Sequence, residues 1–218
     1  MFRLLRSGRQ FSRCSHRGFL RRHAGSAGAN YLGVITVERS GPDHLPSFGY
    51  GELGHFANSS VVCSQTETVV HAAISVKRKY SADQDFLPMT VDYRDRLYAR
   101  GLVPTERGSR EWHGSQSETL VGRMIDRAMR PLFPAGYVDD LQVLVTCHAA
   151  DGQSDPTVLG MNAASCALLL SSAPWRGPVG CVRIGRLDGK LVVNPTVQQM
   201  KDSTLDLVYA GTVLRPVM

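Results

Sequence analysis

Alternating apolar and polar positions predict a series of short strands in the first half of the chain. From Val61 to Val76 β-branched and apolar residues dominate except at the polar turn Ser64 to Glu67, a pattern typical of two strands joined as a hairpin. Phe86 to Tyr93 predicts another strand. Pro88 lies within it and cannot donate a ladder hydrogen bond, so this strand is expected at the edge of a sheet.

The second half of the chain continues with apolar runs of strand length. Asp188-Gly189 separates two of these runs and is the strongest short-range hairpin signal in the sequence. The strands predicted here are Leu141 to Ala149, Val179 to Leu187, Lys190 to Val193 and Leu205 to Ala210.

A first helix is predicted to begin after Ser115. Ser115 and Glu118 have the Ser-x-x-Glu spacing of a capping box, in which each side chain accepts a hydrogen bond from the other residue's backbone N–H. Apolar residues follow at helical spacing, and Pro131 ends the helix because proline has no N–H to donate. The apolar positions are Leu120, Val121, Met124, Ile125 and Ala128.

A second helix is predicted to begin at Asp155-Pro156. Aspartate is a favoured N-cap, and proline is tolerated at the first helical position. The segment carries almost no charge and is rich in small residues, so we expect it to be buried at close range against a sheet. The small residues are Gly160, Ala163, Ala164 and Ala167.

The positive charge of the chain is concentrated at its N-terminus. The formal net charge is +6, but seven of the 25 lysines and arginines precede the first acid, Glu38, which leaves 18 bases against 19 acids. The Arg-rich, acid-free leader is typical of a mitochondrial transit peptide; the alternative is a basic arm that binds RNA or membrane. Its arginines are Arg3, Arg6, Arg9, Arg13, Arg17, Arg21 and Arg22.

Two other classes of protein find no support in the sequence. The most apolar run, Met161 to Leu170, is too short and too polar to span a bilayer, so no membrane insertion is expected. The five cysteines are widely spaced and form no Cys-x-x-Cys pair, which predicts reduced core residues and neither a zinc site nor a disulfide framework. These cysteines are Cys14, Cys63, Cys147, Cys166 and Cys181.

Three arginines of the first predicted helix form the main candidate binding site. Arg123, Arg127 and Arg130 are spaced by four and three residues, so they lie along one helical face. Guanidinium groups in such a stripe can grip phosphate oxygens through their planar, permanently charged fork. The alternative is a solvated face with local ion pairs, and Asp126 is well placed to pair with Arg130.

The predicted loop from Gly101 to Gly114 adds further candidates before this helix. Arg107 and Arg110 are cations, and Trp112 can either stack on a base or serve as a packing residue. His113 follows directly. The loop is therefore a second candidate for contact with RNA or phosphate.

No catalytic or metal site stands out from the residues. The chain has no Gly-x-Ser-x-Gly, His-Glu-x-x-His or Walker motif, and no pair of acids has a spacing that identifies metal ligands. His71 and His148 lie in apolar strands, which favours satisfied core histidines over catalytic bases.

Several sequence motifs resemble those of the polynucleotide phosphorylase family. They are Phe86-Leu-Pro-Met-Thr-Val-Asp-Tyr93, Ile125-Asp-Arg-Ala-Met-Arg-Pro-Leu-Phe-Pro134, and Gly177-Pro-Val-Gly180 with Val193-Asn-Pro-Thr196. In that family this order marks the first of two ribonuclease-PH-like cores. The resemblance runs from about Gly51 to Thr212 and is closer to animal mitochondrial members than to bacterial ones.

The resemblance implies a fold and a domain organisation. The expected fold is an α/β (α+β) core with a left-handed βαβ crossover and a mixed sheet packed on helices. Residues 1–36 are expected to be a mitochondrial transit peptide and disordered lead-in. Residues 47–212 are expected to form the first ribonuclease-PH-like domain, incomplete at its C-terminus, and residues 213–218 a divergent tail.

The resemblance also implies an activity. Family members are 3′-to-5′ exoribonucleases that use inorganic phosphate and Mg²⁺ to release nucleoside diphosphates from RNA, and they can run in reverse. Three chains form a ring around single-stranded RNA, and an RNA helicase is a candidate partner. The expected location is mitochondrial, in the matrix or the intermembrane space.

What the resemblance implies for the site is limited to RNA contacts. In the family, the catalytic acids and the principal phosphate site belong to the second core. No catalytic residue is therefore expected in this chain, and the chain by itself is predicted to be inactive. Arg123 and Arg127 match family arginines that reach toward a neighbouring second-core site, and Arg110 matches one at the channel mouth.

The sequence departs from the family pattern at two places. Arg107-Gly108-Ser109-Arg110 stands where the family has two bulky and then two basic residues, which puts base stacking at the channel mouth in doubt. Gly51-Glu-Leu-Gly-His55 stands where the family reads Gly-Lys-Leu-Ala-Arg, so attraction to the RNA backbone is expected to be weaker there.

Two other functions compete with the phosphorolytic enzyme. A non-catalytic RNA-binding or ring-forming scaffold subunit would retain assembly and RNA binding without phosphate-dependent decay. An unstable or regulatory product would instead aggregate through an uncovered sheet edge.

Overall fold

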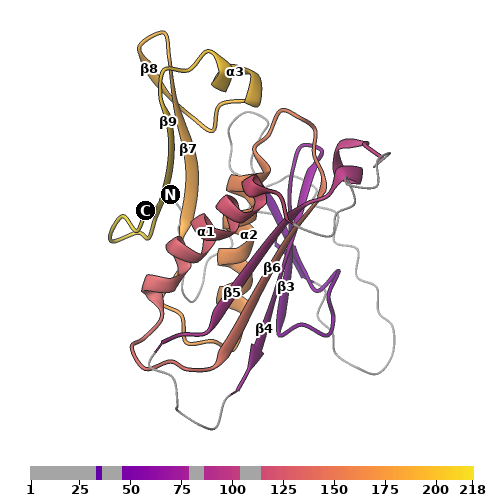
Figure 1. Ribbon diagram of the computed structural model, residues 1–218, viewed down its shortest axis with the longest axis vertical. Helices are drawn as coiled ribbons and strands as arrows, with labels where there is room; N and C mark the ends of the chain where they lie inside the picture. The colour runs from indigo at the N-terminus through magenta and orange to yellow at the C-terminus, as the bar shows by residue number, and fades with distance from the viewer. Residues whose placement is uncertain (1–32, 36–45, 79–85, 104–113) are drawn as a thin grey trace, which may run out of the picture.

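The computed structural model describes residues 33–35, 46–78, 86–103 and 114–218. They form a six-stranded sheet, a three-stranded sheet, and helices packed against them (Figure 1). The predicted α/β class with a mixed sheet is confirmed.

The larger sheet is mixed because one of its strand pairs is parallel. The strand order is β1-β2-β3-β4-β6-β5, and every neighbouring pair is antiparallel except β5 and β6. The strands are β1 (Gly33–Ile35), β2 (Ser47–Tyr50), β3 (Ser59–Gln65), β4 (Thr68–Lys77), β5 (Met89–Asp95) and β6 (Asp140–Ala149).

The predicted hairpin in residues 61–76 is confirmed as β3 and β4. Gln65 pairs with Thr68, so the turn consists of Thr66 and Glu67, within the predicted polar segment. Thr66 has a φ of 52°, an uncommon conformation for a β-branched residue. Asp151 accepts a hydrogen bond from the Thr66 hydroxyl, which helps to hold this turn against the loop after β6.

The strand predicted at 86–93 is β5, and its predicted edge position is confirmed. The strand begins at Met89, immediately after Pro88, whose carbonyl oxygen accepts a hydrogen bond from Leu141 at 3.0 Å. A helix connects β5 to its parallel neighbour β6, which makes a βαβ unit. The left-handedness of this crossover stays a prediction.

The first predicted helix is α1 (Gln116–Met129), and its capping box is confirmed. The Glu118 N–H donates to Ser115 Oγ at 3.1 Å, and the Ser115 N–H donates to Glu118 Oε2 at 2.6 Å. A 3₁₀ turn, η3 (Arg130–Leu132), continues from the helix and contains Pro131. The helix therefore ends where the proline predicts.

The second predicted helix is α2 (Pro156–Leu170), which packs on both sheets. Asp155 caps it by accepting a hydrogen bond from Thr157 N–H at 2.9 Å, as predicted. At Gly160 an added Cβ would lie 3.2 Å from Tyr93 and 3.2 Å from Val145. Close approach to the sheet thus requires a small residue there.

The smaller sheet has the strand order β8-β7-β9 and is antiparallel throughout. Its strands are β7 (Gly180–Leu187), β8 (Lys190–Val193) and β9 (Asp206–Gly211), so the predicted hairpin at Asp188-Gly189 is confirmed. The Asn162 side chain of α2 exchanges two hydrogen bonds with the Cys181 backbone, at 2.8 and 3.1 Å. The sheet is therefore fastened to α2 by polar contacts.

Five of the described elements were not predicted from the sequence. They are β1, β2, the 3₁₀ turns η1 (Leu97–Arg100) and η3, and the short helix α3 (Val197–Lys201). Each is five residues long or shorter, too short to show a hydrophobic period. Thr196 and Gln199 form a capping box on α3, a local signal that was overlooked.

The cysteines of the described segments are free. Cys63, Cys147 and Cys181 are buried and Cys166 is partly buried. Burial raises the pKa of the Cys63 and Cys181 thiols to about 12, so neither is a ready nucleophile. Among the described residues no helix is long and apolar enough to cross a membrane.

Candidate nucleic-acid interface

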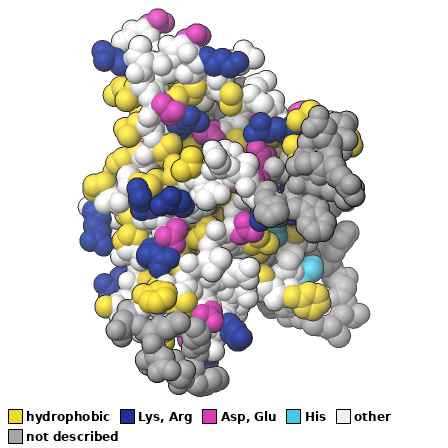
Figure 2. Space-filling model, viewed as in Figure 1, with side chains coloured by type: hydrophobic (Ala, Val, Ile, Leu, Met, Phe, Trp, Pro, Cys, Tyr) yellow, Lys and Arg dark blue, Asp and Glu magenta, His cyan; other side chains and the backbone are white. Residues whose placement is uncertain are grey.

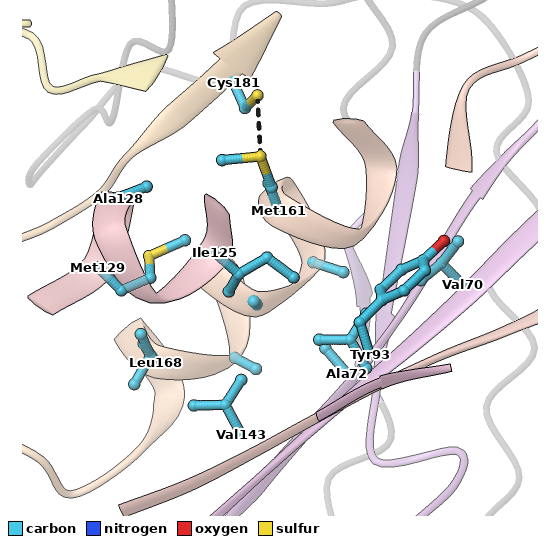
Figure 3. Packing of buried hydrophobic residues seen from close by; sticks show 14 of the residues in the cluster. Val70, Ala72, Tyr93, Ile125, Ala128, Met129, Val143, Met161, Leu168 and Cys181 are labelled. Carbon is cyan, nitrogen blue, oxygen red and sulfur yellow. Dashed lines mark hydrogen bonds between the residues drawn. The ribbon is translucent and has the colours of Figure 1, made fainter. Parts of the chain in front are cut away.

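Helix α1 divides its residues between the core and the solvent. Ile125, Ala128 and Met129 are fully buried against the sheet and α2 (Figure 3). Arg123 and Arg127 project from the opposite side and are exposed. The i,i+4 spacing places these two guanidinium groups one turn apart.

Arg130, the third arginine of the predicted stripe, is engaged within the protein. Its guanidinium donates to both carboxylate oxygens of Asp126, at 2.6 and 3.0 Å. It also donates to the carbonyl oxygens of Leu87 at 2.8 Å and Met89 at 3.3 Å. The structure thus brings Arg130 to the entry of β5, where it holds the C-terminal end of α1 to the edge strand.

The other end of α1 is held to the same strand by Glu118. The Asp95 N–H donates to Glu118 Oε1 at 2.7 Å, while Oε2 completes the capping box. Between these two ends an added Cβ at Gly122 would lie 3.4 Å from the carbonyl oxygen of Val91. The helix is therefore fixed in register along the edge of β5, and this fixes the backbone positions from which its two exposed arginines extend.

A groove of about 460 Å³ runs between α1 and β5. Arg123 lines it from the helix, and Thr90, Asp92 and Arg94 line it from the strand. Arg94 Nε lies 3.1 Å from Asp92 Oδ1, so these two charges largely neutralise each other. In the parts of the chain that the structure describes, no ion pair involves Arg123 or Arg127, so both cations are available to a ligand. We call the surface formed by Arg123, Arg127 and Arg94 the α1 arginine face.

Arg94 was missed by the sequence reasoning. The signal for it was present, because Thr90, Asp92 and Arg94 alternate with the core-facing apolar residues of an edge strand and must share its other side. Two other predicted site residues, Arg107 and Arg110, lie outside the described residues, as do Trp112 and His113.

Several acids of the described segments serve local structure. Asp155 and Asp206 both accept hydrogen bonds from Arg183, at 2.7 and 2.6 Å. Burial alone would raise the pKa of Asp151, but hydrogen bonds from Thr66, Ser154 and Gln153 outweigh it and hold that pKa well below its usual range. In residues 46–78, 86–103 and 114–218 no group of three or more His, Cys, Asp or Glu side chains could hold a metal ion.

The two strand histidines have hydrogen-bond partners, as predicted, but they lie on the sheet surface and are only partly buried. His71 Nε2 lies 2.9 Å from Ser60 Oγ, and His148 Nδ1 lies 2.9 Å from the Tyr98 hydroxyl. Ser60 Oγ donates its proton to the Leu53 carbonyl at 2.5 Å. His71 must therefore donate to Ser60, the opposite of what a base activating a serine would do.

Comparison with known proteins places the chain within a family of RNA-processing enzymes. The model of the 3′ exoribonuclease family, domain 1, matches residues 50–174, and the model of domain 2 of that family matches residues 177–213. Together they cover most of both sheets and the helices between them.

Three of the curated relatives that match the chain share one enzyme name. Polyribonucleotide nucleotidyltransferase 2, mitochondrial, of Arabidopsis thaliana is 43% identical over 187 residues, 86% of this chain and 19% of the relative. Its namesake from Oryza sativa subsp. japonica is 45% identical over 75% of this chain and 17% of the relative. Polyribonucleotide nucleotidyltransferase of Methylacidiphilum infernorum is 43% identical over 84% of this chain and 26% of the relative. The chain thus spans between about a sixth and a quarter of the length of these relatives.

Solved structures share the fold at low sequence identity. Rice Rrp46 superimposes with a TM-score of 0.61 at 14% identity, over 81% of this chain and 79% of that chain. The Archaeoglobus fulgidus exosome with RNA bound to the active site gives a TM-score of 0.57 at 18% identity, over 80% of this chain and 75% of that chain.

Because Arg130 is bonded within the protein and Arg123 is exposed, replacing them is expected to change the free energy of unfolding by different amounts. Arg130→Met is expected to lower the free energy of unfolding by about 1–3 kcal/mol, because Asp126 and two backbone carbonyls lose a charged donor. Arg123→Met, matched in chemistry, is expected to change it by less than about 0.5 kcal/mol. Urea unfolding of both variants measures the difference; equal losses would contradict the assignment of Arg130 to the fold.

The histidine pair predicts a pH dependence of stability. Burial lowers the pKa of His71, with a further contribution from His148, and burial together with Arg96 lowers the pKa of His148. The folded state therefore binds fewer protons than the unfolded state, so stability is full above the unfolded pKa of about 6.5 and falls as the pH drops below it.

Urea unfolding at pH 7.5 and pH 5.5 measures this loss, and His71→Gln with His148→Gln provides the control. The double variant is expected to lose less stability than the wild type between these two pH values. The same pH dependence in both proteins would assign it to other groups.

Proposed function

Because the chain belongs to the 3′ exoribonuclease family, we propose that it is the RNA-binding first core of a phosphorolytic exoribonuclease. In this proposal the full-length protein degrades and processes RNA in the 3′-to-5′ direction, using inorganic phosphate to release nucleoside diphosphates. It is a polyribonucleotide nucleotidyltransferase like the relatives that match the chain at 43–45% identity. The chain described here supplies RNA contacts and is inactive alone.

The observation that carries this proposal is the α1 arginine face. Arg123 and Arg127 are exposed one turn apart on a helix that is fixed to an edge strand at both ends. Two guanidinium groups that form no ion pair with the described residues, carried by a helix fixed to the sheet, can contact successive phosphates. Figure 2 shows Lys and Arg side chains gathered over this side of the molecule.

The chemistry divides between binding and reaction. Phosphorolysis requires phosphate and the 3′-terminal linkage to be held in line, and positive groups stabilise charge on the departing nucleotide. Arg123 and Arg127 can hold the RNA backbone and lend positive charge, while Arg130 and Glu118 keep α1 in place. Mg²⁺ is proposed as the cofactor of the full-length enzyme, but the described residues offer no group of ligands for it.

The proposed function also includes a domain organisation, a cellular location and an assembly. Residues 1–36 act as a mitochondrial import signal, residues 47–212 form the first core, and residues 213–218 are a divergent tail. The mitochondrial names of two plant relatives support import, to the matrix or the intermembrane space. A homotrimeric ring around single-stranded RNA, with an RNA helicase as partner, completes the assembly.

A second candidate function is a non-catalytic RNA-binding or ring-forming scaffold subunit. It is compatible with the acids that line the groove beside the α1 arginine face, because Asp92 pairs with Arg94 and Asp126 pairs with Arg130. The scaffold function would be supported if a longer form of the protein assembled and bound RNA but released no nucleoside diphosphates in the presence of phosphate.

RNA binding by the chain tests the proposal. Arg123→Glu with Arg127→Glu is expected to weaken binding of a fluorescent single-stranded RNA at least about tenfold, and to flatten the log–log salt dependence by roughly 1.4. Fluorescence anisotropy over a range of salt concentrations measures both. Lys190→Glu with Lys201→Glu, two exposed lysines far from α1, has the same change in net charge and is the matched control.

Both double variants retain the leader arginines. An equal loss of RNA affinity in the two would mean that net charge, and not the α1 arginine face, determines binding. The same α1 variant placed in a full-length relative should reduce phosphate-dependent RNA decay far more than it reduces the free energy of unfolding. Unchanged decay there would assign Arg123 and Arg127 to structure alone.

A further inference from the structure

Three aromatic rings form a row on the larger sheet. The ring centres of His71 in β4 and His148 in β6 lie 5.8 Å apart, and those of His148 and Tyr98 in η1 lie 6.3 Å apart. Ala72 and Cys147, strand neighbours of the two histidines, are fully buried in the core. Because side chains alternate along a strand, both histidines point to the opposite face of the sheet, and Tyr98 joins them there. We call His71, His148 and Tyr98 the aromatic platform.

Hydrogen bonds hold the aromatic platform in place. His71 Nε2 donates to Ser60 Oγ at 2.9 Å, and Ser60 donates in turn to the Leu53 carbonyl oxygen. The Tyr98 hydroxyl lies 2.9 Å from His148 Nδ1, so these two rings meet edge to edge. Their planes differ by 24°, and together they present one nearly flat surface. A ligand that stacks on this surface finds it already formed, which lowers the entropic cost of binding.

The aromatic platform is accessible, and its rings are mainly uncharged at neutral pH. Tyr98 is 57% exposed, and the two histidines are only partly buried. Burial lowers the pKa of both histidines, so their rings are mainly neutral at pH 7.5. A flat, neutral aromatic surface binds other flat rings by stacking, and every nucleobase has a π-face that can stack on it.

Arg94 connects the aromatic platform to the α1 arginine face. Arg94 pairs with Thr146, and Thr146 pairs with His71, so these residues form one row across β5, β6 and β4. Neighbouring strands lie about 4.8 Å apart, which places the backbones of Arg94 and His71 roughly 10 Å from each other. Arg94 also lines the groove that contains Arg123. A single RNA strand that leaves this groove past Arg94 therefore reaches the platform next.

We propose that the aromatic platform stacks on nucleobases of the single-stranded RNA whose phosphates lie along the α1 arginine face. This inference rests on the proposed function and extends the RNA site over the edge of the larger sheet. Stacking tolerates any base, so the platform binds RNA without a strong sequence preference. It also supplies aromatic rings that residues 107–110 lack, where the family pattern has two bulky residues.

Fluorescence anisotropy of the full chain with two RNAs of equal length tests the proposal; one RNA is intact and the other has abasic sites in place of its bases. Tyr98→Ala is expected to weaken binding of the intact RNA at least about fivefold, because a stacked ring is lost, and to leave binding of the abasic RNA unchanged. Tyr98→Phe keeps the ring and should retain most of the affinity. Tyr209→Ala, which removes a 41% exposed tyrosine from β9, is the matched control and should bind both RNAs like the wild type.

Comparison with the α1 variant separates the aromatic platform from the proposed function. Arg123→Glu with Arg127→Glu should weaken binding of both RNAs, because both carry phosphates. If that variant loses affinity while Tyr98→Ala binds both RNAs like the wild type, the α1 arginine face stands and the platform is overturned. The platform is also overturned if Tyr98→Ala weakens binding of the two RNAs equally, or if the wild type binds them with the same affinity.

A second measurement needs no variant for its main result. The fluorescence of 2-aminopurine falls when this base stacks on an aromatic ring, so it is placed at successive positions of an otherwise uridine RNA. Quenching when the wild-type chain binds is the expected result. RNA that binds with no change in fluorescence at any position would overturn the proposal, as would quenching that Tyr98→Ala retains in full.

Discussion

The rest of the structure depends on the burial of α2 between two sheets. The helix has no charged residue, and nine of its residues are buried. It packs on β3 and β4 and also on β7, so it joins the smaller sheet to the larger one. Gly160 permits the close approach to the larger sheet, and Asn162 and Ser165 satisfy backbone groups of Cys181 and Val179.

Helix α1 uses one side for packing against the core and the other side for the proposed binding of RNA. Its inner side completes the core, while hydrogen bonds at its two ends fasten it to the unpaired edge of β5. An edge strand is an aggregation hazard, and here a helix covers it. The same helix carries Arg123 and Arg127 on its exposed side. The attachment of α1 to β5 therefore both covers the edge strand and positions the two cations.

Most of the fold followed from local sequence signals. The capping box at Ser115, the Asp155-Pro156 helix start, the Asp188-Gly189 hairpin and the edge position implied by Pro88 are each decided by a few neighbouring residues. The short strands β1 and β2 depend on pairing with β3, which no local pattern reports. Among the site residues, spacing alone could not show that Arg130 bonds to Leu87 and Met89, more than 40 residues away in sequence, nor that Arg94 shares a groove with Arg123.

In the proposed complex, single-stranded RNA lies along the α1 arginine face. Photo-crosslinking of the full chain to 4-thiouridine-substituted RNA, followed by mass spectrometry of the peptides, tests this directly. Crosslinks concentrated in residues 89–95 and 116–132 are the expected result. Crosslinks confined to the leader, or spread over the β7–β9 sheet with none in α1, would contradict it.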